Sequence, residues 1–84
     1  MKKRTLILRD PKTRLTLHEA HLEIHTPVAS YRVAFVHLAR VYLNKSLDIT
    51  IGTCYALSQK TELYLIDHEG YILAKLTEVD DATV

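Results

Sequence analysis

The sequence predicts a small, mainly β domain with one short helix (an α+β fold), built as two small packed sheets of seven or eight short strands. Apolar and polar residues alternate over most of the chain, which is the period of a strand. The period becomes helical only near residues 51–59. The 84 residues are 48% hydrophobic and 25% charged, which suits one globular domain with a thin core.

The N-terminal part is expected to contain five strands, over residues 5–9, 14–18, 21–25, 31–35 and 40–43. The first ends at Asp10-Pro11, a pair that favours a turn. The second and third form a hairpin across Glu19-Ala20, and their alternation places four side chains inward: Leu15, Leu17, Leu22 and Ile24. A bend near residues 36–38 precedes the fifth strand.

The C-terminal part is expected to contain an alternating segment at 47–49, a helix at 51–59, and strands at 62–66 and 71–76. Thr50 is an acceptable helix N-cap. The predicted buried stripe of the helix is Ile51, Cys54, Tyr55 and Ser58, with Leu57 beside them. Gly70 is available for the positive-φ position of the last hairpin.

These elements predict a single β-rich domain over residues 4–76. Residues 1–3 read as a basic arm, and residues 77–84 as an acidic tail or the start of an interdomain linker. One cysteine, Cys54, cannot form an internal disulfide. The N-terminus has no signal-peptide core, and no apolar run approaches a membrane span. We therefore expect a cytoplasmic protein with no membrane association.

The net charge of +1 conceals a segregation. Residues 1–14 hold six basic side chains against one acidic, which gives +5, whereas the remaining residues hold five basic against nine acidic, which gives −4. A clustered basic surface is typical of phosphate binding. The alternative is a solvated arm followed by the exposed face of a first strand.

His18, His21 and His25 are the candidates for metal ligands. His21 and His25 flank Glu23 on one strand, and His18 lies on the partner strand. A structural zinc site normally takes four ligands, and strand alternation alone would place these histidines on the polar face of a half-exposed hairpin. We therefore expect no metal and no other cofactor in this chain.

No arrangement for catalysis is found. The sequence lacks a GxGxxG, a phosphate-binding loop and a GxSxG motif. Cys54 lies on the apolar stripe and reads as a small hydrophobe rather than a nucleophile. The five tyrosines are spread one per element, which suits strand packing and interfaces better than base stacking. We do not expect an enzyme working alone.

The order of elements resembles the N-terminal β-rich domain of the CRISPR-associated spacer-acquisition integrase, the universal CRISPR adaptation endonuclease. The resemblance covers residues 5–76. It begins with Leu6-Ile7-Leu8 and the hairpin Leu15-Thr16-Leu17 and Leu22-Glu23-Ile24, and continues through residues 35–43. It ends with Leu47-Asp48-Ile49-Thr50, Cys54-Tyr55-Ala56-Leu57, Leu63-Tyr64-Leu65-Ile66-Asp67 and residues 70–76.

The resemblance implies a homodimerising, DNA-bracing domain without catalytic residues. In the family, the residues that bind a divalent metal and join DNA belong to a helical C-terminal domain, so this chain would be a fragment or truncated form. The first loop approaches DNA in some members, sometimes through an aromatic wedge. Here that loop has no aromatic residue, and its DNA-contact candidates are Arg9, Lys12 and Arg14.

Two alternatives remain open at this stage. One is a free-standing small β-rich protein that binds another protein, including a full-length integrase whose assembly it would block. The other is a nucleic-acid-binding module in its own right. The second protein of CRISPR adaptation is a further partner that the resemblance implies.

Overall fold

The protein is described from a computed structural model that places residues 2–76, and these residues form seven strands, one 3₁₀ turn and one α-helix. In chain order the elements are β1 (Arg4–Leu8), β2 (Arg14–Leu17), β3 (His21–His25), β4 (Ser30–Ala34), η1 (Phe35–His37), β5 (Leu38–Asn44), α1 (Ile51–Ser58), β6 (Glu62–Ile66) and β7 (Ile72–Leu76). The predicted fold class is confirmed. The predicted acidic tail, residues 77–84, lies outside the described residues.

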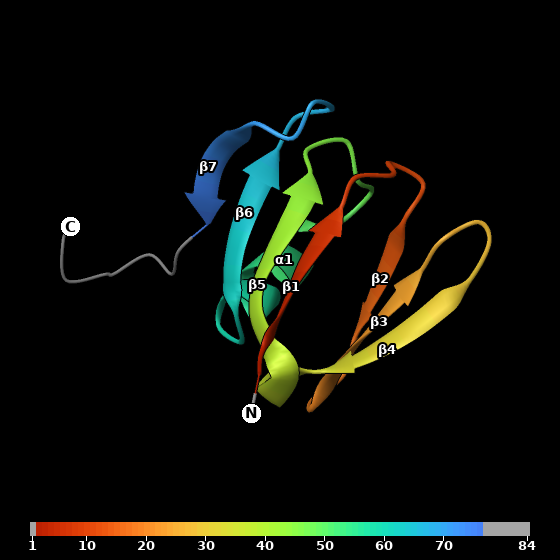
Figure 1. Cartoon of the computed structure of the whole chain (residues 1–84), viewed down its shortest axis with the longest axis vertical. Helices are drawn as coiled ribbons and strands as arrows, with labels where there is room; N and C mark the ends of the chain where they lie inside the picture. The colour runs from red at the N-terminus through yellow and green to blue at the C-terminus, as the bar shows by residue number, and fades with distance from the viewer. Residues whose placement is uncertain (1, 77–84) are drawn as a thin grey trace, which may run out of the picture.

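Two sheets are present within residues 2–76. The four-stranded sheet has the order β1-β5-β6-β7, and the three-stranded sheet has the order β2-β3-β4. β1, β5 and β6 run parallel to one another, and β7 runs antiparallel to β6. Parallel neighbours require a crossover connection. The whole three-stranded sheet lies in the connection from β1 to β5, and α1 lies in the connection from β5 to β6 (Figure 1).

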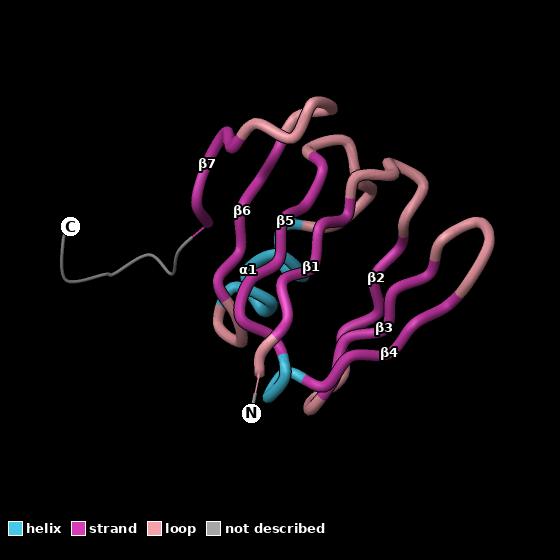
Figure 2. Tube along the Cα trace, in the orientation of Figure 1, coloured by secondary structure: helices cyan, strands magenta, loops and turns pink. Residues whose placement is uncertain are grey.

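The core lies on one face of the four-stranded sheet. Figure 2 shows α1 behind this sheet and the three-stranded sheet beside its β1 edge. Alternation along β5 turns Val41 and Leu43 into the core, where they join Leu22 of β3, Leu57 of α1 and Leu63 of β6. All five side chains have no exposed surface. The predicted inward positions Leu22 and Ile24 are confirmed as core residues.

The strand predicted at residues 47–49 is wrong, because this segment follows a turn at residues 45–46 and has no strand structure. The backbone N–H of Leu47 donates to the carbonyl of Asn44 at 3.0 Å, and the N–H of Ile49 donates to the carbonyl of Leu47 at 3.0 Å. Backbone groups that are satisfied this locally are not available for a ladder. The apolar side chain of Leu47 is instead buried in the hydrophobic core.

The predicted helix is confirmed, with its end one residue earlier, but its predicted buried face is only partly correct. Thr50 caps the N-terminus by accepting a hydrogen bond from the N–H of Thr53 at 3.1 Å. Leu57 is fully buried, whereas Ile51 is 89% exposed and Tyr55 is 49% exposed. Apolar residues occur on every side of this short helix, so periodicity could not select the face that meets the sheet.

Candidate functional site

An open groove of about 1080 Å³ follows strand β1. It runs from the uncovered face of the four-stranded sheet, over β1, to the inner side of β3 and β4. We call it the β1 groove and define it by its apolar lining: Leu6, Ile7, Ile24, Tyr31, Val33 and Ile72. Among the described strands, β1 pairs only with β5. The groove therefore has a strand edge on which further pairing can occur.

The groove leaves large apolar side chains in contact with solvent. Ile7 is 59% exposed, Tyr31 is 55% exposed and Ile72 is 58% exposed. Leu6-Ile7-Leu8 is a continuous apolar run, which is typical of a strand that is buried on both faces. Only one face of β1 is covered within residues 2–76. An exposed apolar patch of this kind marks an interaction surface.

Arg9 joins two loops at one end of this groove. Its Nη2 donates a hydrogen bond to the carbonyl oxygen of Glu69 at 2.7 Å. Its own carbonyl accepts a hydrogen bond from Nδ2 of the buried Asn44 at 2.7 Å. Gly70 has φ of 94°, and a Cβ there would lie 2.5 Å from Nη2 of Arg9. The predicted positive-φ role of Gly70 is confirmed, and its lack of a side chain also admits the guanidinium.

Lys12 and Arg14 are the other two predicted DNA-contact residues. Asp10 shapes their loop, because its side chain accepts a hydrogen bond from the N–H of Lys12 at 2.9 Å and its carbonyl accepts one from the N–H of Thr13 at 3.0 Å. Both basic side chains are exposed. Arg9, by contrast, has the structural contact with Glu69 described above. A DNA-contact role for all three residues stays a prediction.

The three predicted histidines surround one carboxylate. Nε2 of His18 lies 3.0 Å from Oε1 of Glu23, Nε2 of His21 lies 3.6 Å from the same oxygen, and Nε2 of His25 lies 3.3 Å from Oε2. Nη2 of Arg32 on β4 lies 3.4 Å from Oε1. We call His18, His21, Glu23 and His25 the His–Glu cluster. It occupies the half-exposed polar face of the hairpin, as strand alternation predicts.

The electrostatics of the cluster favour an ionised Glu23. Partial desolvation by itself would raise the pKa of this carboxyl, but the neighbouring His18 imidazole and Arg32 guanidinium oppose it. Together with the nearby imidazoles of His21 and His25, they hold the pKa below its ordinary value. The carboxylate therefore keeps its negative charge among four cationic or titratable partners.

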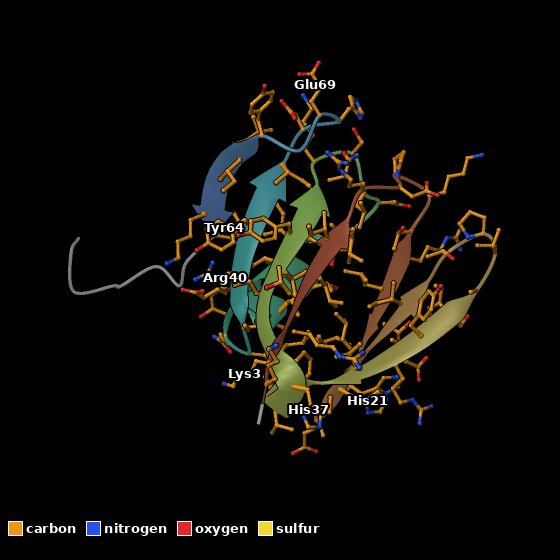
Figure 3. The ribbon with its side chains drawn as sticks, in the orientation of Figure 1. Lys3, His21, His37, Arg40, Tyr64 and Glu69 are labelled. Atoms are coloured by element: carbon orange, nitrogen blue, oxygen red, sulfur yellow. The ribbon has the colours of Figure 1, made fainter. Side chains whose placement is uncertain are left out.

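Figure 3 separates these two polar regions in space. Its view places His21 with His37 and Lys3 at one end of the molecule, and Glu69 at the other. His21 of the His–Glu cluster and Glu69 therefore lie at opposite ends of the molecule.

The remaining candidates have structural surroundings. Burial raises the pKa of the Cys54 thiol, which agrees with a small hydrophobe rather than a nucleophile. The rings of Tyr42 and Tyr64 stack with centroids 5.0 Å apart on the uncovered face of the four-stranded sheet. Within residues 2–76, no helix is long and apolar enough to cross a membrane.

Sequence reasoning missed the β1 groove and the role of Asn44. Unbroken apolar runs at residues 6–8 and 72–73 were the available signal for the groove, because each places an apolar side chain on the face that alternation reserves for polar residues. Asn44 had no comparable signal. Its amide bonds to Arg9, which is 35 residues away in the sequence.

Comparison with known proteins identifies the fold. No protein-family model matches the sequence, and no curated protein matches it. The chain is similar in structure to a chain of a partial Cas6-RT-Cas1–Cas2 complex, with a TM-score of 0.74 and 17% identity over 98% of this chain and 25% of that chain. It is also similar to a Cas1 protein from Thermotoga maritima, with a TM-score of 0.69 and 15% identity over 93% and 26% of the two chains.

The class defined by these findings is a two-sheet, mainly β domain with a single crossover helix. More particularly, it is a Cas1-like β fold, so the predicted resemblance to the CRISPR spacer-acquisition integrase is confirmed at the level of fold. The chain spans about a quarter of the length of the solved chains that it matches.

Proposed function

We propose that this chain is a non-catalytic dimerisation and DNA-bracing domain of a CRISPR spacer-acquisition integrase, present as a fragment or truncated form. The observation that carries the proposal is that nearly the whole chain superimposes on a quarter of Cas1-like chains. The divalent metal of the joining reaction would belong to the helical domain, and no catalytic residue is assigned here.

The β1 groove is the proposed dimer surface. It combines an unpaired strand edge with three large apolar side chains that are each more than half exposed: Ile7, Tyr31 and Ile72. A second copy of the chain would cover both features, because a two-fold interface brings the same patch from each protomer together. Burial of these side chains would supply the hydrophobic stabilisation of the dimer.

The loop from residues 9 to 14 is the proposed DNA contact. Lys12 and Arg14 carry exposed charges, and no ion pair involves either side chain among the described residues. Such side chains can neutralise phosphates without first breaking an internal contact. The matched chain from the Cas6-RT-Cas1–Cas2 complex supports a partnership with the second CRISPR adaptation protein as part of this proposal.

Size-exclusion chromatography with light scattering tests the dimer. We expect the mass to rise with concentration toward about twice the 9.6 kDa of the chain. A mass that stays at 9.6 kDa up to the highest attainable concentration would contradict dimerisation.

A further inference from the structure

The His–Glu cluster brings three metal-binding groups from a tight hairpin to one point. One ring nitrogen of His18, one ring nitrogen of His21 and a carboxylate oxygen of Glu23 all lie within 4.8 Å of one another. The hairpin fixes this arrangement, since the N–H of His18 donates to the carbonyl of His21 at 3.0 Å. Imidazole nitrogen and carboxylate oxygen are donors that zinc accepts.

Two of the three spacings between the ligand atoms suit a tetrahedral ion. Bonds of about 2.0–2.1 Å place neighbouring ligand atoms about 3.3–3.4 Å apart in a tetrahedron. The two nitrogens lie 3.0 and 3.6 Å from Oε1 of Glu23, which brackets that edge. The rings of His18 and His21 are stacked with centroids 4.3 Å apart and 19° between their planes. Because the lone pair of an imidazole nitrogen lies in its ring plane, one of the two stacked rings would turn out of the stack to admit the ion.

His21 has an unsatisfied nitrogen at this point. Its Nε2 is buried, makes no hydrogen bond, and lies 3.6 Å from Oε1 of Glu23. Burying a polar atom without a hydrogen-bond partner costs free energy, because the atom gives up its hydrogen bonds to water. Metal coordination would satisfy this nitrogen without moving the backbone.

The surroundings of Glu23 resemble the outer shell of a metal site. Nε2 of His25 contacts the second carboxylate oxygen, and Nδ1 of His25 hydrogen-bonds Oγ of Ser30 at 3.1 Å. Outer groups of this kind orient the ligands and contribute to metal affinity. Arg32 lies beside Oε1 itself, so its positive charge competes with an ion.

We propose that His18, His21 and Glu23 bind a divalent transition-metal ion of the zinc class, with His25 holding the carboxylate in place. Three protein ligands leave the fourth position to water, as in open zinc sites. The ion would cross-link β3 to the turn that follows β2 and so stabilise the hairpin. This inference rests on the cluster alone and does not depend on dimerisation or DNA binding.

Titration calorimetry with zinc chloride on the full chain at pH 7.5 is the test. We expect one zinc ion per chain and at least about 100-fold weaker binding after His21→Ala or Glu23→Gln, each of which removes a ligand. His25→Ala should weaken binding about tenfold, since it removes an outer-shell contact. Arg32→Gln should tighten binding, because it removes the competing charge.

His37→Ala and His68→Ala are the matched controls, because both histidines lie outside the cluster. Circular dichroism establishes that each variant is folded, and Glu23→Gln preserves the side-chain shape. The absence of zinc binding at millimolar metal would overturn the proposal. Equal losses in His37→Ala and His21→Ala would also overturn it, since zinc would then bind histidines without regard to this geometry.

Discussion

Ile7→Asp is expected to dissociate the proposed dimer, with a dissociation constant raised at least about 100-fold, which corresponds to about 2.7 kcal/mol. Ile7 lies on the edge strand β1, and more than half of its surface contacts solvent in the single chain. A carboxylate buried against apolar side chains without a partner costs several kcal/mol. Sedimentation velocity measures the loss of dimer.

The control for Ile7→Asp is Ile51→Asp on α1. Ile51 is 89% exposed and lies outside the β1 groove, so the same substitution adds the same charge without reaching the proposed interface. Tyr31→Asp, on the other side of the groove, should reproduce the effect of Ile7→Asp. If Ile51→Asp dissociates the dimer and both groove variants leave it intact, the interface lies elsewhere.

Lys12→Ala combined with Arg14→Ala is expected to weaken binding to duplex DNA about 100-fold at 50 mM salt, with the difference fading toward 1 M salt. The slope of log affinity against log salt concentration is negative, and each neutralised phosphate adds about 0.9 to its magnitude. The loss of two contacts therefore makes the slope shallower by about 1.8. Fluorescence anisotropy with a labelled duplex measures both quantities. Arg9 is left unchanged because of its structural contact with Glu69.

Lys45→Ala combined with Lys60→Ala removes the same charge from exposed positions outside residues 9–14. This control should change the affinity only slightly and leave the salt slope intact. An unchanged slope in the Lys12 and Arg14 double variant would show that the loop is not the DNA contact, even if the chain binds DNA.

The strands could be predicted well from the sequence because their burial follows the local alternation. β3 illustrates this: Leu22 and Ile24 enter the core, while His21, Glu23 and His25 remain on the polar face. The same alternation identified the histidines as neighbours. It did not supply the distances, which depend on the side-chain rotamers around Glu23.

The errors had two causes: local hydrogen bonds replaced a strand at residues 47–49, and contacts distant in the sequence decided the helix face and the position of Arg9. The segment Leu47-Asp48-Ile49 alternates as a strand would, but two of its backbone N–H groups are satisfied by local hydrogen bonds. The face of α1 is selected by the sheet against which Leu57 packs. Arg9 meets Glu69 across 60 residues of sequence. No local pattern encodes the last two contacts.

Hydrogen exchange at increasing protein concentration tests the proposed interface most directly. If a second copy covers the β1 groove, amides on the free edge of residues 4–8 should exchange more slowly as the dimer forms, because water no longer reaches that edge. Amides of α1, residues 51–58, should exchange at an unchanged rate. A dimer that forms without protection of residues 4–8, or that protects α1 instead, would contradict the proposal.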